Sequence, residues 1–187
     1  ELKWRRRNQR PDMMRIGSAI PDFTWGWNTT LQWKDFDLNL LFNGSQGNDV
    51  WNFTRWLPMS FSTDARYATA REVLDRWTPK NENSDIPGIT TSTNTLQQTS
   101  QFVEDGSFIR LSNITLGYNL PLSLMKSWKI SQARFYVSGQ NLFVITKYKG
   151  FDPELSTTPN SSDVAVGIDN STYPAFRTFT VGVRLVL

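Results

Sequence analysis

The 187-residue sequence contains no cysteine and no histidine. Without cysteine the chain forms no disulfide and offers no thiolate nucleophile. Without histidine it has no Ser/His or Cys/His catalytic pair. The same two absences remove the usual ligands of zinc. We therefore predict no catalytic residue, no metal site and no bound cofactor.

Long apolar runs and a strong net charge are also missing. No stretch of 18 apolar residues occurs, which excludes a transmembrane helix. The formal net charge is only +3. Basic residues gather near the start of the sequence, at Arg5, Arg6, Arg7, Arg10 and Arg15. Such a run is typical of a solvated surface, so we predict no nucleic-acid partner.

Aromatic residues are abundant, with eight Trp, twelve Phe and five Tyr, and many of them alternate with polar residues. Alternation is strict over 23–33 and nearly strict over 36–44, which predicts two strands that each have an apolar and a polar face. Lys34-Asp35 between them predicts a two-residue turn and hence a hairpin.

Three further long strands are predicted at 107–119, 131–145 and 175–187. In the first of these, Ile109 and Leu111 are out of phase with the second half, and either a β-bulge or emergence of the strand above the membrane would account for the shift. The strands exceed the usual five or six residues and match the roughly 9–11 that a tilted strand needs to cross a membrane. The predicted fold class is therefore all-β, a membrane-spanning antiparallel β-barrel segment of about five long strands.

The lengths of the connections predict the orientation. Two long polar segments, 45–106 and 146–174, alternate with short connections at 34–35 and 120–130. Outer-membrane barrels have short periplasmic turns and long extracellular loops, which places the C-terminus in the periplasm. In the first loop a short helix is predicted from Asp64 to about Trp77. Five strands with open edges cannot stand in lipid, so we expect the chain to be part of a larger barrel.

The alternation also assigns side chains to the two faces. Residues expected to contact lipid or its interface are Trp25, Trp27, Trp33, Tyr118, Phe135, Phe143 and Phe179. Residues expected to face the lumen are Arg134, Gln140 and Arg184, because a charge in contact with lipid costs about 2–4 kcal/mol at the membrane midplane. Two roles remain open for the arginines: pairing with carboxylates of a plug or of neighbouring strands, and guidance of a substrate.

Several motifs resemble one family. Residues 135–143 (Phe-Tyr-Val-Ser-Gly-Gln-Asn-Leu-Phe), with Lys147-Tyr148 and Asp152-Pro153-Glu154, are similar to the C-terminal region of the SusC/RagA-like TonB-dependent transporters of Bacteroidetes. Supporting motifs stand in the same order at 16–23, 36–38, 75–79, 109–118 and 173–174. The resemblance covers about residues 16–187. Thr180, Gly182, Leu185 and Leu187 also resemble the C-terminal assembly signal of outer-membrane barrels, although Leu187 stands where that signal usually has an aromatic residue.

The resemblance implies a 22-stranded barrel in the bacterial outer membrane with an N-terminal plug that is absent from this sequence. It implies TonB-driven import of an oligosaccharide, a peptide or a similar nutrient, together with a SusD-like surface lipoprotein. The implied partners are the remainder of the barrel and its plug, that lipoprotein, the TonB complex, outer-membrane lipid and the barrel assembly machinery.

Two alternatives stay open at this point. One is a passive porin-like barrel, which a plug domain upstream in the same gene would eliminate. The other is a soluble all-β carbohydrate-binding module, which would bury the apolar faces of its strands against one another.

Overall fold

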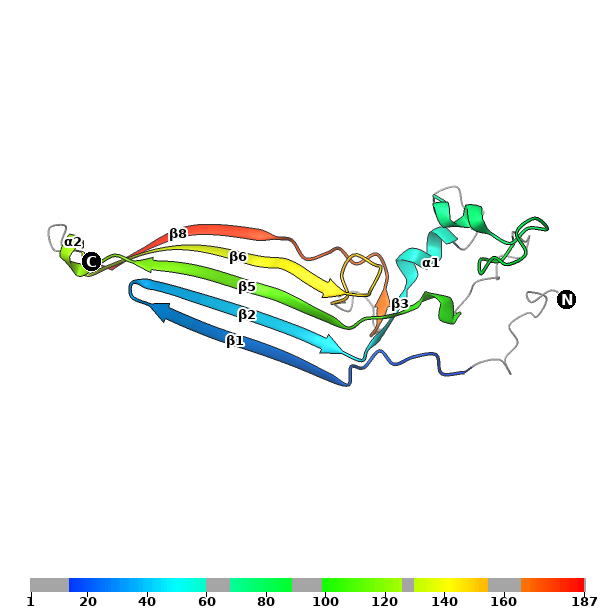
Figure 1. The fold of residues 1–187 in the computed structure, drawn as a ribbon, viewed down its shortest axis with the longest axis horizontal. Helices are drawn as coiled ribbons and strands as arrows, with labels where there is room; N and C mark the ends of the chain where they lie inside the picture. The colour runs from blue at the N-terminus through cyan, green and yellow to red at the C-terminus, as the bar shows by residue number, and fades with distance from the viewer. Residues whose placement is uncertain (1–13, 60–67, 89–98, 126–129, 155–165, 187) are drawn as a thin grey trace.

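A long antiparallel sheet dominates the computed structural model, which describes residues 14–59, 68–88, 99–125, 130–154 and 166–186 (Figure 1). Its strand order is β1-β2-β5-β6-β8. The five strands are β1 (Phe23–Trp33), β2 (Phe36–Gln46), β5 (Phe108–Asn119), β6 (Gln132–Thr146) and β8 (Thr178–Val186). The antiparallel all-β class is therefore confirmed, and the strand bounds lie within three residues of those expected from alternation.

The β1–β2 hairpin forms as predicted. Trp33 pairs with Phe36, so Lys34 and Asp35 alone make the turn. Lys34 has φ of 54°, the left-handed value that a two-residue hairpin requires at its first turn position. From this turn the strands stay in register as far as Phe23 and Gln46.

Of the two explanations for the phase shift in β5, the structure shows a bulge, and it lies at Ser112. Leu111 pairs with Phe143 and Asn113 pairs with Gln140, which leaves Ser112 unpaired on β5. On β6 the pairing omits Asn141 and Leu142, and Asn141 takes φ of 52° to make the detour. The bulge restores the phase, so Ile109 and Leu111 share a face with the apolar residues after Ser112.

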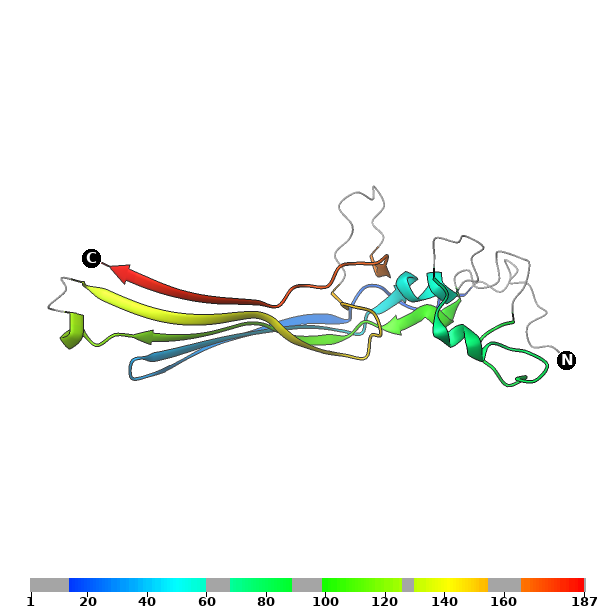
Figure 2. The same ribbon diagram turned by 90° about the horizontal axis from the view of Figure 1, so that it is seen from above.

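The sheet is a single elongated, curved layer (Figure 2). One end, here called the turn end, carries the β1–β2 turn, the short helix α2 (Leu122–Met125) and the end of β8 (Figure 1). The opposite end, the loop end, carries the two long connections.

Among the described residues, none of the helices combines the length and the apolarity needed to cross a membrane.

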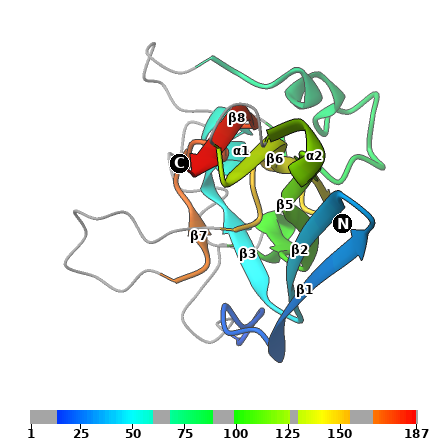
Figure 3. The same cartoon turned by 90° about the vertical axis from the view of Figure 1, so that its left-hand side faces the viewer.

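A second, small sheet at the loop end joins the two long connections. It has the order β4-β3-β7, with β3 (Asp49–Asn52), β4 (Val103–Asp105) and β7 (Ile168–Asp169). Strand β3 from the first connection pairs in parallel with β7 from the second (Figure 3). Beside it, Met59, Val73 and Phe102 form a small buried cluster that Trp51 and Trp56 cover.

The short helix of the first connection is not where the sequence predicts it. The α-helix is α1 (Phe53–Met59), and within 68–77 the structure has a 3-10 turn, η2 (Arg71–Asp75). The predicted start at Asp64 lies outside the described residues. Ala70, Leu74 and Trp77 have helical spacing but do not form one buried helical face, because Leu74 is 72% exposed and only Val73 of this turn is buried.

Candidate functional site

One face of the long sheet is apolar, and its side chains form rows across the strands. At the turn end the row is aromatic except on the last strand: Trp33, Phe36, Tyr118, Phe135 and Val183. The rings of Phe36 and Tyr118 have centroids 4.7 Å apart. The next row is aliphatic: Leu31, Leu38, Leu116, Val137 and Val181.

A second aromatic row lies nearer the loop end of the same face. It consists of Trp27, Phe42, Leu111 and Phe143, which pair across β1, β2, β5 and β6. Trp27 stacks on Phe42 with a centroid distance of 5.6 Å. Between these two girdle-like rows lie the aliphatic row and a mixed row of Thr29, Leu40, Ile114, Gly139 and Phe179.

Most of the apolar face is uncovered by other described residues, although Leu111 and Ala133 on it are buried. Trp33 is 69% exposed, Phe179 71% and Val181 79%. Trp25 shares this face and is half-buried, because its indole lies over Gly44, where an added Cβ would meet the ring at 2.6 Å. All seven residues predicted for the lipid or interface set therefore lie on one face. An apolar surface of this extent is rare on a soluble monomer.

The opposite face is polar and internally hydrogen-bonded. Five polar residues, one from each strand, form a row across the sheet: Thr30, Asn39, Thr115, Ser138 and Thr180. The amide of Asn39 donates to Thr30 Oγ1 at 3.0 Å and to Asn28 Oδ1 at 3.1 Å. Thr115 Oγ1 donates to Ser138 Oγ at 3.1 Å. These bonds satisfy short polar side chains without covering the face.

A charged pair spans three strands of this polar face near the turn end. Arg134 on β6 binds Asp37 on β2, with Nε donating to Oδ1 at 3.0 Å and a terminal nitrogen donating to Oδ2. Gly117 on β5 lies between them, and an added Cβ there would stand 2.4 Å from Arg134 and 2.5 Å from Asp37. The sequence placed both charged residues on this face but did not predict their pairing.

The other lumen candidates also lie on the polar face. Arg184 pairs directly across from Arg134 on β8, and Gln140 stands opposite Thr178. Gly182 lies beneath Tyr136, whose ring would be 2.3 Å from an added Cβ. Of the predicted assembly signal, Thr180 and Gly182 lie on this face and Leu185 on the apolar one, while Leu187 lies outside the described residues.

At the loop end, buried charges attach the second long connection to the sheet. Arg110, which is 4% exposed, binds Asp152, which is 6% exposed, and its Nε lies 3.1 Å from Glu154 Oε2. Asp152 also accepts a hydrogen bond from the backbone N–H of Ala175 at 3.2 Å. Sequence reasoning missed Arg110, because the bulge at Ser112 hides its orientation.

A second buried contact fixes the same connection to the small sheet. Tyr148 Oη donates to Oδ2 of Asp169, a residue only 1% exposed. Burial first, and then this hydrogen bond, raises the pKa of Tyr148 above its ordinary range. Glu104 on β4 accepts from the backbone N–H of Lys149 at 2.9 Å and from Arg55 at 3.2 Å. Both long connections therefore belong to one folded unit.

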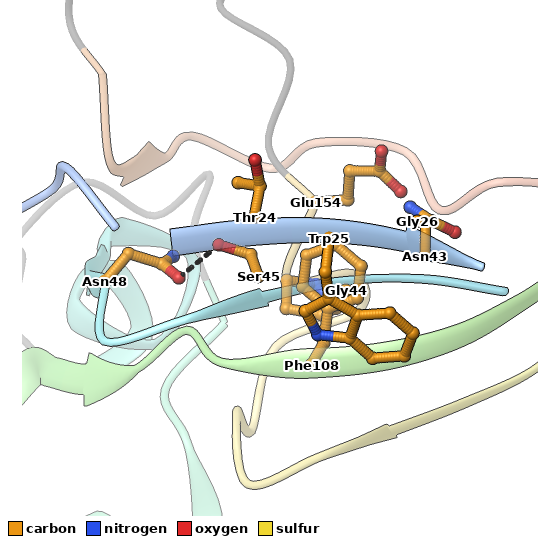
Figure 4. A pocket seen from close by; sticks show the side chains of 10 residues that line it. Thr24, Trp25, Gly26, Asn43, Gly44, Ser45, Asn48, Phe108 and Glu154 are labelled. Atoms are coloured by element: carbon orange, nitrogen blue, oxygen red, sulfur yellow. Dashed lines mark hydrogen bonds between the residues drawn. The ribbon is translucent and has the colours of Figure 1, made fainter. Parts of the chain in front are cut away.

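A shallow cleft of about 450 Å³ opens where the polar face meets this unit (Figure 4). Its walls include Thr24, Asn43, Ser45, Asn48, Phe108 and Glu154. Thr24 and Trp25 project to opposite sides of β1 (Figure 4). Ser45 Oγ donates to Asn48 Oδ1 at 2.9 Å. The cleft offers neutral hydrogen-bonding groups and a carboxylate, a lining suited to holding a polar molecule rather than to activating a nucleophile.

Within the part of the chain that the structure describes, no three His, Cys, Asp or Glu residues gather closely enough to hold a metal ion.

Comparison with known proteins agrees with this two-faced sheet. The TonB-dependent receptor P3 of Formosa agariphila is 38% identical over 177 residues, which cover 93% of this chain and 17% of that receptor. The RagAB peptide importer in its closed-closed state superposes with a TM-score of 0.76 at 29% identity, over 90% of this chain and 18% of the matched chain. This chain is homologous to a segment of the TonB-dependent receptors of the SusC/RagA family.

Two further TonB-dependent receptors are similar over 93% and 88% of this chain. The TonB-dependent receptor P26 of Formosa agariphila is 35% identical over 178 residues, and the TonB-dependent receptor SusC of Bacteroides thetaiotaomicron is 28% identical over 165 residues. No family model matches the chain. The chain spans less than a fifth of the length of these relatives. TonB-dependent receptors are transporters of the outer membrane and not enzymes, in agreement with the expectation from the sequence.

Proposed function

We propose that this chain forms part of the barrel wall of a TonB-dependent importer that carries a nutrient across the bacterial outer membrane. The observation that carries the proposal is the single-layer sheet with an uncovered apolar face and a hydrogen-bonded polar face, which superposes on the RagAB peptide importer. In this assignment the apolar face contacts lipid and the polar face lines the lumen.

The dimensions of the sheet support the lipid assignment. Strand β1 has 11 residues, and the ten steps from its first to its last Cα atom span about 34 Å at about 3.4 Å per step. A strand tilt of about 40° reduces that length to a height of about 26 Å, close to the apolar band of outer-membrane barrels. The two aromatic rows then take the positions of the interfacial girdles, with the aliphatic row between them.

The connections support an orientation. All short connections and the end of β8 lie at the turn end, and both long connections lie at the loop end (Figure 1). Short turns are periplasmic and long loops extracellular in outer-membrane barrels. We therefore place the C-terminal end of β8 in the periplasm, where Thr180, Gly182, Leu185 and Leu187 would serve recognition by the barrel assembly machinery.

The remainder of the importer follows from the length of the relatives and from the open edges of β1 and β8. Neither edge pairs with another strand among the described residues. An unpaired edge is not tolerated in lipid, so further strands must close the barrel to the 22 that the resemblance implies. The plug and the segment that contacts TonB would belong to that remainder.

The proposed partner above the loop end is a SusD-like surface lipoprotein, and the proposed cargo is a peptide, an oligosaccharide or a similar nutrient. Support for the partner comes from the match to the two-component RagAB importer and to SusC. The folded unit at the loop end, in which both long connections are tied together, provides a defined surface for such contact.

Uptake by cells that produce the full-length receptor tests this function. We expect accumulation of a labelled nutrient that stops when an uncoupler collapses the proton-motive force, and that falls when the gene for the lipoprotein is deleted. Uptake insensitive to the uncoupler would support the passive porin-like alternative instead. The soluble alternative predicts that the apolar face is buried within the chain, whereas this face is uncovered in the described residues.

A further inference from the structure

We propose that Arg184 forms an ion pair with a carboxylate that lies outside residues 1–187, on the segment of the receptor that covers β8 from the lumen side. This inference rests on the proposed barrel. It assigns a partner of defined chemistry, an Asp or Glu side chain, to one position of the wall.

The register brings two positive charges together. Arg134 and Arg184 are direct cross-strand neighbours on β6 and β8, so both guanidinium groups project from the polar face. Like charges directly opposite each other destabilise a strand pair. A sheet with such a pair needs a negatively charged group on the same face, at the same distance from the turn end.

The nearest carboxylate is already used. Asp37 accepts two hydrogen bonds from Arg134 and a third from Asn119 Nδ2 at 3.2 Å. Arg184, in contrast, makes no ion pair and no side-chain hydrogen bond with any described residue. The charge of Arg134 is therefore compensated within the sheet, and the charge of Arg184 is not.

No other acidic residue of the sheet is in reach. Asp35 lies in the β1–β2 turn, and β2 is separated from β8 by β5 and β6, which is about 14 Å at about 4.8 Å per strand. Residues 126–129 of the connection between β5 and β6 read Lys-Ser-Trp-Lys and add no carboxylate. The remaining acidic residues of the described polar face, such as Asp152 and Glu154, lie at the loop end and bind Arg110.

The missing partner must therefore come from another part of the receptor. Ionisable residues at membrane depth face an interior or a water-filled cavity, and they commonly pair there with groups of opposite charge. Both a strand that closes the barrel beside β8 and a plug that fills the lumen would stand against this position. Either source supplies the same group, a carboxylate facing Arg184.

Zero-length cross-linking of the full-length receptor in outer-membrane vesicles tests the inference. The Arg184→Lys variant keeps the positive charge and introduces an amine that a carbodiimide couples to a carboxylate in direct contact. We expect mass spectrometry to find an amide bond between position 184 and one Asp or Glu outside residues 1–187. The matched control is Thr178→Lys, on the same strand and the same face, which should not be coupled to that acidic residue.

Two outcomes would overturn the inference. One is coupling of position 184 only to a carboxylate within residues 1–187, or to none at all. The other is an Arg184→Gln variant with unchanged barrel stability but reduced uptake of an anionic nutrient, which would assign the residue to the substrate. Heat-modifiable migration of the unaltered receptor on SDS gels shows, independently of the cross-link, whether the barrel forms. If this migration is absent, the proposed function is contradicted as well as this inference.

Discussion

Arg134 on β6 binds Asp37 on β2 across the intervening strand β5, through two hydrogen bonds that match the fork of the guanidinium to the two carboxylate oxygens. The pair passes over Gly117, where the absence of a side chain leaves the space that both groups occupy. A single ion pair thereby joins three strands near the turn end of the sheet.

Replacing Gly117 by alanine should separate this pair. An added Cβ would stand 2.4 Å from Arg134 and 2.5 Å from Asp37, so the two side chains must move apart. Because hydrogen bonds to charged groups contribute about 1.5–3 kcal/mol each, we expect a loss of that order in the free energy of unfolding. The temperature at which the full-length barrel loses its resistance to SDS measures the effect.

Gly26→Ala provides the control for the Gly117 variant. Gly26 lies on the same polar face, and its added Cβ would meet only a backbone oxygen at 3.9 Å, an ordinary contact. We expect little change in the unfolding temperature of this variant. An equal decrease in both variants would show that glycine is needed for general strand geometry and not for the charged pair.

Removing the hydroxyl of Tyr148 should loosen the second long connection from the small sheet. In Tyr148→Phe the buried carboxylate of Asp169 loses its bond to Oη and keeps the bond from the backbone N–H of Thr172 at 3.0 Å. A buried polar group left without a partner costs about 1–3 kcal/mol. Hydrogen exchange of residues 146–174 should accelerate, while Tyr173→Phe, which alters a 75% exposed side chain, should leave it unchanged.

The same tyrosine predicts a response to alkaline pH. The pKa of Tyr148 is raised by burial and by Asp169, so the folded connection holds the phenol proton more tightly than the unfolded chain does. The free energy of unfolding therefore does not change with ionisation of this phenol below about pH 10, the ordinary pKa of tyrosine. It decreases as the pH rises above that value. We expect proteolysis of this connection to increase above about pH 10 in the unaltered receptor. Tyr148→Phe should lack that additional increase, and identical pH profiles would contradict the prediction.

Adjacent residues of β1 should respond in opposite ways to a new charge. Leu31→Arg places a guanidinium on the face assigned to lipid, at a cost of about 2–4 kcal/mol near the midplane. Gln32→Arg places it on the face assigned to the lumen, opposite Asp37, where water and polar groups surround it. The yield of folded receptor in the outer membrane should fall for the first variant and stay near normal for the second. Equal yields would contradict the assignment of the faces.

The long strands could be predicted because each carries its own two-residue period. Apolar residues at every second position define β1 without reference to any other part of the chain. The phase shift in β5 was visible as well, since Ile109 and Leu111 break the phase by one residue, but the sequence did not decide between a bulge and emergence above the membrane. Alternation also placed Arg134, Arg184 and Gln140 on the polar face, because it depends on parity alone.

The contacts at the loop end could not be predicted in this way. Strands β3, β4 and β7 have only two to four residues, too few to show a period. Their pairing brings Trp51 next to Ile168, residues far apart in the sequence. The bonds of Arg110 to Asp152 and of Tyr148 to Asp169 likewise depend on tertiary folding. Tyr148 and Asp152 stand in motifs that resemble the family, but a motif alone does not show which side chains meet.

Nitroxide scanning of β6 in the full-length receptor tests the central claim, that one face of this sheet contacts lipid and the other an aqueous lumen. Single cysteines at Phe135, Tyr136, Val137 and Ser138 would be labelled in turn, since these 187 residues contain no native cysteine. We predict that labels at Phe135 and Val137 are relaxed mainly by oxygen, which concentrates in lipid, and labels at Tyr136 and Ser138 mainly by a water-soluble nickel chelate. Relaxation by the chelate at all four positions, or protection of Phe135 and Val137 from both agents, would contradict the account.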